Sequence, residues 1–89
     1  MEIKRDYKVR TIAGQNIVIS YGELNVSMTK VISLNDTSLY LWNKLFGKSF
    51  ELEDVVSALL DEYEVEPSQA SKDAANWISL LQKAGLLYE

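Results

Sequence analysis

The hydrophobic pattern of this chain changes its period once, close to Asn35, and that change limits the folds available to it. Before Asn35, apolar and polar residues alternate, which is typical of strands with one buried face. After Asn35, apolar residues recur at spacings of three and four, which is typical of amphipathic helices. The pattern therefore predicts a strand region followed by a helical region.

The strand region is divided by turn-forming residues. It contains predicted strands at 7–12, 17–21 and 28–34, a turn at 13–16, and an irregular connection at 22–27. In the third strand, Ile32 and Leu34 lie on one side of the alternation, and we expect them to face the core. A strand that ends at the central helix can also be an edge of its sheet.

The helical region divides into three amphipathic segments. Asn35 is the predicted N-cap of the first helix, which is apolar on nearly all sides and ends at Gly47. The second helix begins near Glu51 and carries an apolar stripe of Leu52, Val55, Val56, Leu59, Leu60 and Tyr63, with Phe50 stapled onto Val55. The third begins at Pro67, ends at Gly85, and buries a predicted stripe of Ala70, Ala74, Trp77, Ile78 and Leu81.

Three strands followed by three helices (β-β-β-α-α-α), with a tight turn before the last helix, outline a small winged helix-turn-helix domain. We therefore predict the α+β class, with a three-stranded antiparallel sheet. Further short strands are expected at 49–50 and 86–87. At 89 residues the chain is one domain, 1–89, and residues 1–6 are expected to form a flexible, charged N-terminal segment.

The residue types exclude most chemistry. The chain has no Cys and no His, which removes disulfides, the usual zinc ligands, thiol chemistry and imidazole catalysis. No glycine-rich phosphate loop is present, and the acidic run over 61–66 lacks the spacing of a calcium-binding loop. We therefore predict a protein that is not an enzyme and has no catalytic residue, cofactor or metal.

Charge bears on the choice of partner. Residues 1–30 hold five Lys or Arg against three Asp or Glu, a net +2, whereas residues 31–89 hold four Lys against ten, a net −6. A basic strand region would attract an acidic peptide, although two solvated faces would look the same. The acidic balance and the sparse cations of the third helix disfavour nucleic acid. A winged-helix DNA-binding regulator is kept as the alternative function.

The start of the chain and its apolar runs bear on location. Residues 1–10 are charged and hold no apolar segment of the kind found in secretory signals. No apolar run approaches the ~18 residues of a membrane span. We expect a cytoplasmic protein with no membrane partner.

An edge strand offers unpaired backbone groups to a peptide that adds as a further strand. The third helix would then form the opposite wall of a groove. On a helical wheel, Trp77 lies at a margin of the apolar face, and Leu80 lies beyond the stripe that a core helix needs. Leu80 is therefore either a solitary exposed leucine or a wall residue. The same edge would also allow two copies to pair as a homodimer.

The residues of the helical region and of the strand before it resemble the PqqD-like family, named for coenzyme PQQ synthesis protein D. The resemblance covers residues 7–88 and is carried by the segments 32–37, 39–42, 52–56, 63–65 and 85–87, with Leu45, Gly47, Leu59, Leu60, Asp73, Trp77, Ile78 and Leu81. Ala74 and Trp77 depart from the larger aliphatics and the Phe or Leu that are common there, which indicates altered packing.

The resemblance implies a non-catalytic recognition element for ribosomally made, post-translationally modified peptides. Such a domain binds the leader segment of a precursor peptide as an added strand. It then presents the peptide to a modifying enzyme, such as a radical S-adenosylmethionine protein or a leader peptidase. Carried over by position, the strand side of this site is Lys30, Val31, Ile32 and Ser33. The helix side, chosen with the wheel argument, is Asp73, Trp77 and Leu80.

Overall fold

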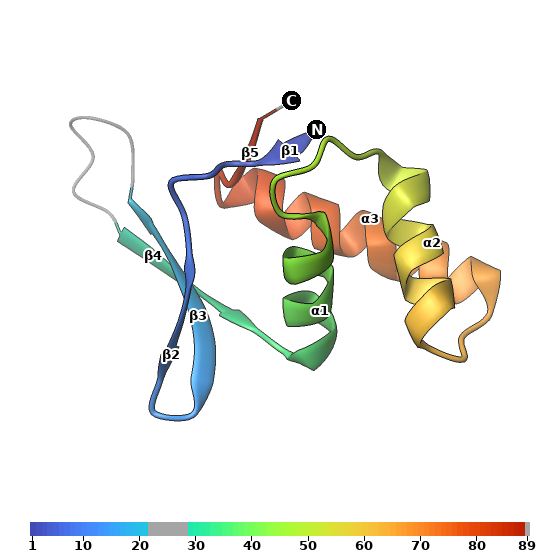
Figure 1. Cartoon of the computed structure of the whole chain (residues 1–89), viewed down its shortest axis with the longest axis horizontal. Coiled ribbons are helices and arrows are strands. Elements are labelled where there is room, and N and C mark those ends of the chain that lie inside the picture. The colour runs from blue at the N-terminus through green and yellow to red at the C-terminus, as the bar shows by residue number, and fades with distance from the viewer. Residues whose placement is uncertain (22–28, 89) are drawn as a thin grey trace.

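Strands and helices follow the predicted order (Figure 1), and the short strand expected at 86–87 is found at Leu87–Tyr88. The short strand at Glu2–Ile3 was not predicted, and in place of the strand expected at 49–50 there is an isolated bridge between Glu2 and Ser49. The computed structural model describes residues 1–21 and 29–88; the predicted connection over 22–27, and Met28, lie outside the described residues. The strands are β1 (Glu2–Ile3), β2 (Val9–Ile12), β3 (Gln15–Tyr21), β4 (Thr29–Leu34) and β5 (Leu87–Tyr88). The helices are α1 (Asp36–Leu45), α2 (Leu52–Glu62) and α3 (Pro67–Lys83). The predicted α+β class is confirmed.

The main sheet is antiparallel, with the order β2-β3-β4. Its first turn is tighter than predicted, because only Ala13 and Gly14 lie outside the strands, and both have positive φ angles, 53° and 78°. Two such residues reverse the chain with a twist that suits an antiparallel hairpin. Gln15 therefore pairs directly with Ile12, and the prediction of a four-residue turn is wrong.

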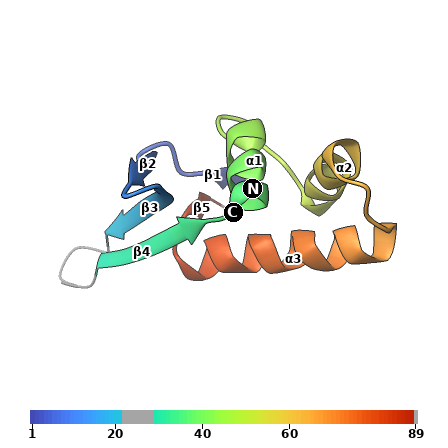
Figure 2. The ribbon, with the colours of Figure 1, turned by 90° about the horizontal axis from the view of Figure 1, so that it is seen from below.

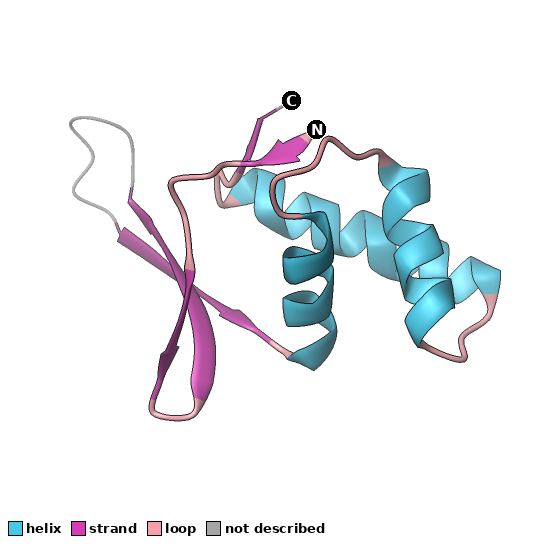
Figure 3. Cartoon of the chain, viewed as in Figure 1, coloured by secondary structure: helices cyan, strands magenta, loops and turns pink. Residues whose placement is uncertain are grey.

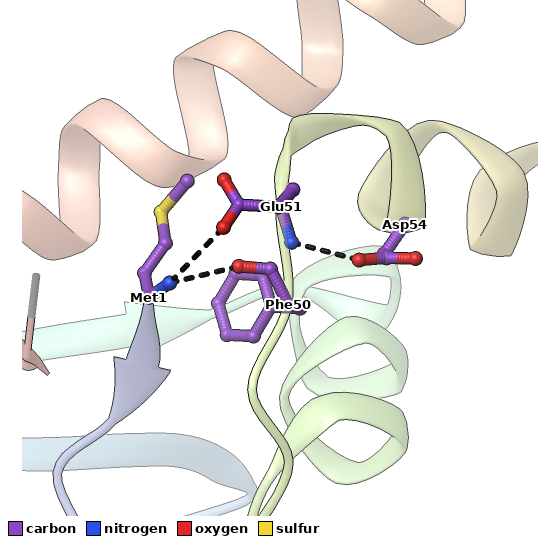
Figure 4. A network of polar contacts seen from close by, with 4 residues as sticks. All are labelled: Met1, Phe50, Glu51 and Asp54. Atoms are coloured by element: carbon purple, nitrogen blue, oxygen red, sulfur yellow. Dashed lines mark hydrogen bonds and ion pairs between the residues drawn. The ribbon is translucent and has the colours of Figure 1, made fainter.

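The N-terminal segment is part of the fold, in contrast to the flexible segment expected over 1–6. β1 pairs with β5, and Ile3 is fully buried in the core. The Met1 ammonium donates a hydrogen bond to the Phe50 carbonyl at 2.9 Å and lies 3.8 Å from a Glu51 carboxylate oxygen (Figure 4). Burial of Ile3 opposes fraying of this end, since an exposed Ile would forfeit about 1.5–3 kcal/mol of transfer free energy.

Helix α1 begins and ends where the sequence predicts. The Asn35 side chain accepts a hydrogen bond from the Ser38 N–H at 2.8 Å, and Gly47 follows the helix with a φ of 81°. The cap satisfies one of the free N–H groups of the first turn. Because Asn35 directly follows Leu34, the same cap fixes the point at which the chain passes from sheet to helix.

We expect Asn35→Ala to lower the free energy of unfolding by about 1 kcal/mol, because it removes this cap. Asn43→Ala is the matched control, since Asn43 is an exposed residue inside the same helix, where Ala has the higher helix propensity. Urea denaturation of both variants measures the difference. Equal stability of the two variants would show that the cap bond contributes nothing.

The helices pack on a shared core, with α3 running beneath α1 and α2 in Figure 2. All five residues of the predicted α3 stripe are buried. The α2 stripe is partly wrong, because Leu52 and Leu60 are exposed and the small Ala58 is buried instead. Ala58 also receives a hydrogen bond from the Tyr40 hydroxyl at its carbonyl, 3.1 Å away, and this contact ties α2 to α1.

The sheet lies to one side of the helices (Figure 3). Ile32 and Leu34 join the core together with Val18, which confirms that they face inward. Ile17 is also buried, but on the opposite face of β3 and outside that core. One face of the sheet thus packs toward the helices. At its C-terminal end, β4 leads directly into α1.

Candidate functional site

The main sheet has two edge strands, β2 and β4, and β4 is the one that leads into the helices. In the order β2-β3-β4, this strand has a partner only on its β3 side among the described residues. Figure 2 shows β4 as the strand of the main sheet nearest to α3. Of the two edges, that of β4 thus lies on the α3 side of the sheet (Figure 2).

The tight first turn determines which residues of β3 bond to β2. Ile12 and Gln15 flank the two-residue turn and form a hydrogen-bonded pair. Bonded and non-bonded pairs alternate along an antiparallel ladder. Ile17 therefore directs its backbone groups toward β2, whereas Val18 directs its own toward β4, where it pairs with Ile32.

The same alternation continues along β4. Because Ile32 bonds to β3, its two neighbours, Val31 and Ser33, direct their N–H and C=O groups away from the sheet. Their side chains are exposed, that of Val31 to 62%. Of the predicted strand-side residues, Val31 and Ser33 thus offer four backbone groups at the edge. The backbones of Lys30 and Ile32 bond to β3, and the Ile32 side chain belongs to the core.

An open cleft of about 360 Å³ lies beyond the C-terminal end of β4. One wall comes from the start of α1 and its cap, and the other comes from α3. Leu59 of α2 completes the lining. The cleft is lined by Asn35, Thr37, Ser38, Leu41, Leu59, Asp73, Asn76, Trp77 and Leu80.

All three predicted helix-side residues line this cleft. Asp73, Trp77 and Leu80, with Asn76, are spaced so that they occupy one stripe of α3. Leu80 is 44% exposed, whereas Trp77 is only 6% exposed and packs toward Phe50, with ring centroids 6.2 Å apart. Leu80 is thus a wall residue of the cleft.

Sequence reasoning missed the α1 wall, made by Thr37, Ser38 and Leu41. It assigned Asn35 only to capping and did not single out Asn76 as a wall residue. The i, i+3, i+4, i+7 spacing of the α3 stripe was a signal for Asn76. No comparable signal marks the α1 residues, because their position depends on how α1 packs against α3.

Asp73 is the charged residue of the cleft lining. Its carboxylate accepts a hydrogen bond from the Gln69 side-chain amide at 2.8 Å. Within residues 1–21 and 29–88, no group of three or more carboxylates gathers in a way that could hold a metal ion. In the same part of the chain, no helix is long and apolar enough to cross a membrane. The site therefore offers backbone pairing and a cleft with both apolar and hydrogen-bonding side chains in its lining.

The comparison with protein families identifies the chain. Residues 22–87 match the model of coenzyme PQQ synthesis protein D, PqqD. The chain belongs to the PqqD family. The matched range is shorter than the resemblance over 7–88, since the hairpin of β2 and β3 lies outside it. The PqqD signature thus resides in the helical region, β4 and the start of β5.

A solved structure shares the fold of this PqqD-family chain. It is described as TbiB1 in complex with the TbiA(beta) leader peptide, with a TM-score of 0.71 and 20% sequence identity. The match covers 100% of this chain and 99% of that one. No curated protein sequence gives a significant match. At this level of identity the similarity establishes the fold, including the hairpin that the family model leaves out.

Proposed function

We propose that this PqqD-family protein binds the leader segment of a ribosomally made precursor peptide and presents it to a modifying enzyme in the cytoplasm. The leader adds as a strand to β4, beside Val31 and Ser33, and sends side chains into the cleft along Asp73, Trp77 and Leu80. The observation that carries the proposal is a free strand edge that leads into a cleft. Membership of the PqqD family and the shared fold with a leader-bound protein support it.

The free energies of these contacts explain why binding needs both the strand edge and the cleft. Four backbone hydrogen bonds at Val31 and Ser33 contribute about 0.5–1.5 kcal/mol each. Ordering the peptide costs about 1–2 kcal/mol per residue, which offsets much of that gain. A micromolar dissociation constant requires about −8 kcal/mol. Apolar anchors in the cleft, at about 1.5–3 kcal/mol each, supply the difference.

Amide hydrogen exchange tests this arrangement residue by residue. The probe is a synthetic peptide with the N-terminal sequence of a short open reading frame adjacent to the gene. On binding, exchange at the Val31 and Ser33 amides should slow by about tenfold or more, because these N–H groups gain partners. The Ile32 amide already bonds to β3 and should change little. Saturable binding without protection of Val31 and Ser33 would contradict strand addition at β4.

We expect no binding to duplex DNA above background at physiological salt. The chain carries a net charge of −4, and α3, which would be the recognition helix, holds only two cations, Lys72 and Lys83. Fluorescence anisotropy with mixed-sequence and palindromic duplexes, over a range of salt concentrations, measures this. A sequence-selective complex at nanomolar concentration would favour the regulator function instead.

A further inference from the structure

The indole nitrogen of Trp77 has no hydrogen-bond partner. Trp77 is 6% exposed, its Nε1 atom is buried, and among the described residues it is the one buried side-chain polar atom without a partner. A buried donor without an acceptor is unfavourable, and such groups are rare in folded proteins. Trp77 lines the cleft of the proposed leader site. An acceptor that reaches Nε1 would therefore gain a hydrogen bond without displacing a protein partner.

Asp73 restricts the chemistry of that acceptor. It lies four residues before Trp77 on α3, and both line the cleft. Side chains at this spacing are neighbours, with Cβ atoms about 5–6 Å apart. A carboxylate ligand would supply an acceptor for Trp77 but would be repelled by Asp73. A ligand that also donates a hydrogen bond satisfies both residues.

We propose that the cleft takes a side-chain carboxamide, from an Asn or Gln of the bound leader. The inference rests on the proposed function and adds a specificity to it. The amide oxygen accepts from Trp77 Nε1–H, and the amide nitrogen donates to the Asp73 carboxylate. Gln69 of this chain already makes the second kind of contact with Asp73, at 2.8 Å, and the carboxylate has further lone pairs to offer. A carboxamide carries its acceptor and donor on separate atoms, so one group spans both residues.

Binding of the carboxamide must move side chains in the cleft. Nε1 is covered in the unbound protein, so either the indole turns or its neighbours shift to admit the acceptor. The Trp77 indole N–H resonance therefore reports the contact directly. It should move downfield when a carboxamide binds and should stay in place when an apolar side chain fills the cleft.

The test begins with selection of peptides from a random 15-residue display library against the intact protein. Enriched peptides should carry Asn or Gln at one fixed position relative to alternating apolar residues. One enriched peptide is then synthesised with Gln, Glu or Leu at that position and titrated by calorimetry. The Gln peptide should bind about three- to tenfold more tightly than either other form, as expected for a hydrogen bond of about 0.5–1.5 kcal/mol.

Two variants test whether Trp77 and Asp73 cause the preference for the Gln peptide. Trp77→Phe removes the donor and should reduce the preference for Gln over Leu by about twofold or more, with the remainder supplied by the contact with Asp73. Asp73→Asn removes the repulsion and should reduce the preference for Gln over Glu in the same way. Asp61→Asn is the matched control, since it makes the same charge change at an exposed position outside this cleft, and it should leave both preferences intact. Asp73 is itself exposed, so its variant tests the inference even if Trp77→Phe fails to fold.

The outcomes separate this inference from the proposed function. Absence of any enriched peptide would overturn the proposed function. Enriched peptides that carry apolar, hydroxyl or carboxylate side chains at the fixed position would overturn the carboxamide specificity alone. Preferences that persist unchanged in a folded Trp77→Phe or Asp73→Asn protein would also overturn it.

Discussion

Val31→Pro is expected to weaken peptide binding by about tenfold or more while the domain stays folded. The register places the Val31 N–H at the open edge of β4, where it makes no bond to β3. Proline removes that donor and leaves a carbonyl of the added strand without a partner, which costs about 1–3 kcal/mol. Edge strands tolerate proline where the N–H faces outward. Calorimetric titration with the peptide from the neighbouring reading frame, together with a thermal melt, measures both effects.

Two further variants test which residues of β4 direct their backbone groups away from the sheet. Val31→Ala keeps the N–H group and should bind nearly as well as the wild type, because the Val31 side chain is exposed. Ile32→Pro removes a donor that bonds to β3 and should destabilise the fold. If Val31→Pro unfolds the domain while Ile32→Pro is tolerated, then the N–H that faces outward is that of Ile32 and not that of Val31. If a folded Val31→Pro protein binds with unchanged affinity, the peptide does not add to this edge.

Leu80→Asp is expected to weaken peptide binding by about tenfold or more with little effect on stability. Leu80 is 44% exposed on the cleft wall, so its substitution removes little buried area from the unbound protein. In the complex, an apolar anchor is replaced by a charge that would have to be desolvated beside the peptide. Calorimetric titration with the same peptide measures the affinity, and urea denaturation measures the stability.

Leu60→Asp is a close control for this substitution. Leu60 is 41% exposed, lies near the C-terminal end of its own helix, as Leu80 does, and lies outside the cleft lining. Both variants place an acid near a helix C-terminus and carry the same modest helix-dipole penalty, about 0.3–1 kcal/mol. Binding should fall only in Leu80→Asp. An equal fall in both, or in neither, would show that the cleft wall does not contact the peptide.

The local elements of this protein follow from short-range chemistry, and the sequence predicts them well. Asn35 caps α1 because its side chain reaches the Ser38 N–H three residues on, and Gly47 ends that helix because its positive φ suits glycine. The α3 stripe is fully predicted, since a long helix over a core buries one continuous face. These features depend on neighbours within a few positions along the chain.

Other features depend on packing between distant segments. Leu52 and Leu60 continue the α2 stripe in sequence, yet they are exposed, because the buried face of α2 consists of Val55, Ala58 and Leu59. The N-terminus looks like a charged tail in sequence, yet Ile3 is buried once β1 pairs with β5. Neither outcome has a local signal, since each partner lies tens of residues away.

The sequence by itself determined the order of the main elements, the position of β4 before α1, and the placing of Asp73, Trp77 and Leu80 along one side of α3. Only the tertiary structure decided that Val31 and Ser33 direct their backbone groups outward. Which residues do so depends on the two-residue turn at Ala13 and Gly14, and then on the pairing of β2 with β3 and of β3 with β4. The α1 wall of the cleft was likewise decided by packing. A strand pattern specifies which side chains share a face, but the free edge of a sheet exists only after its strands have paired.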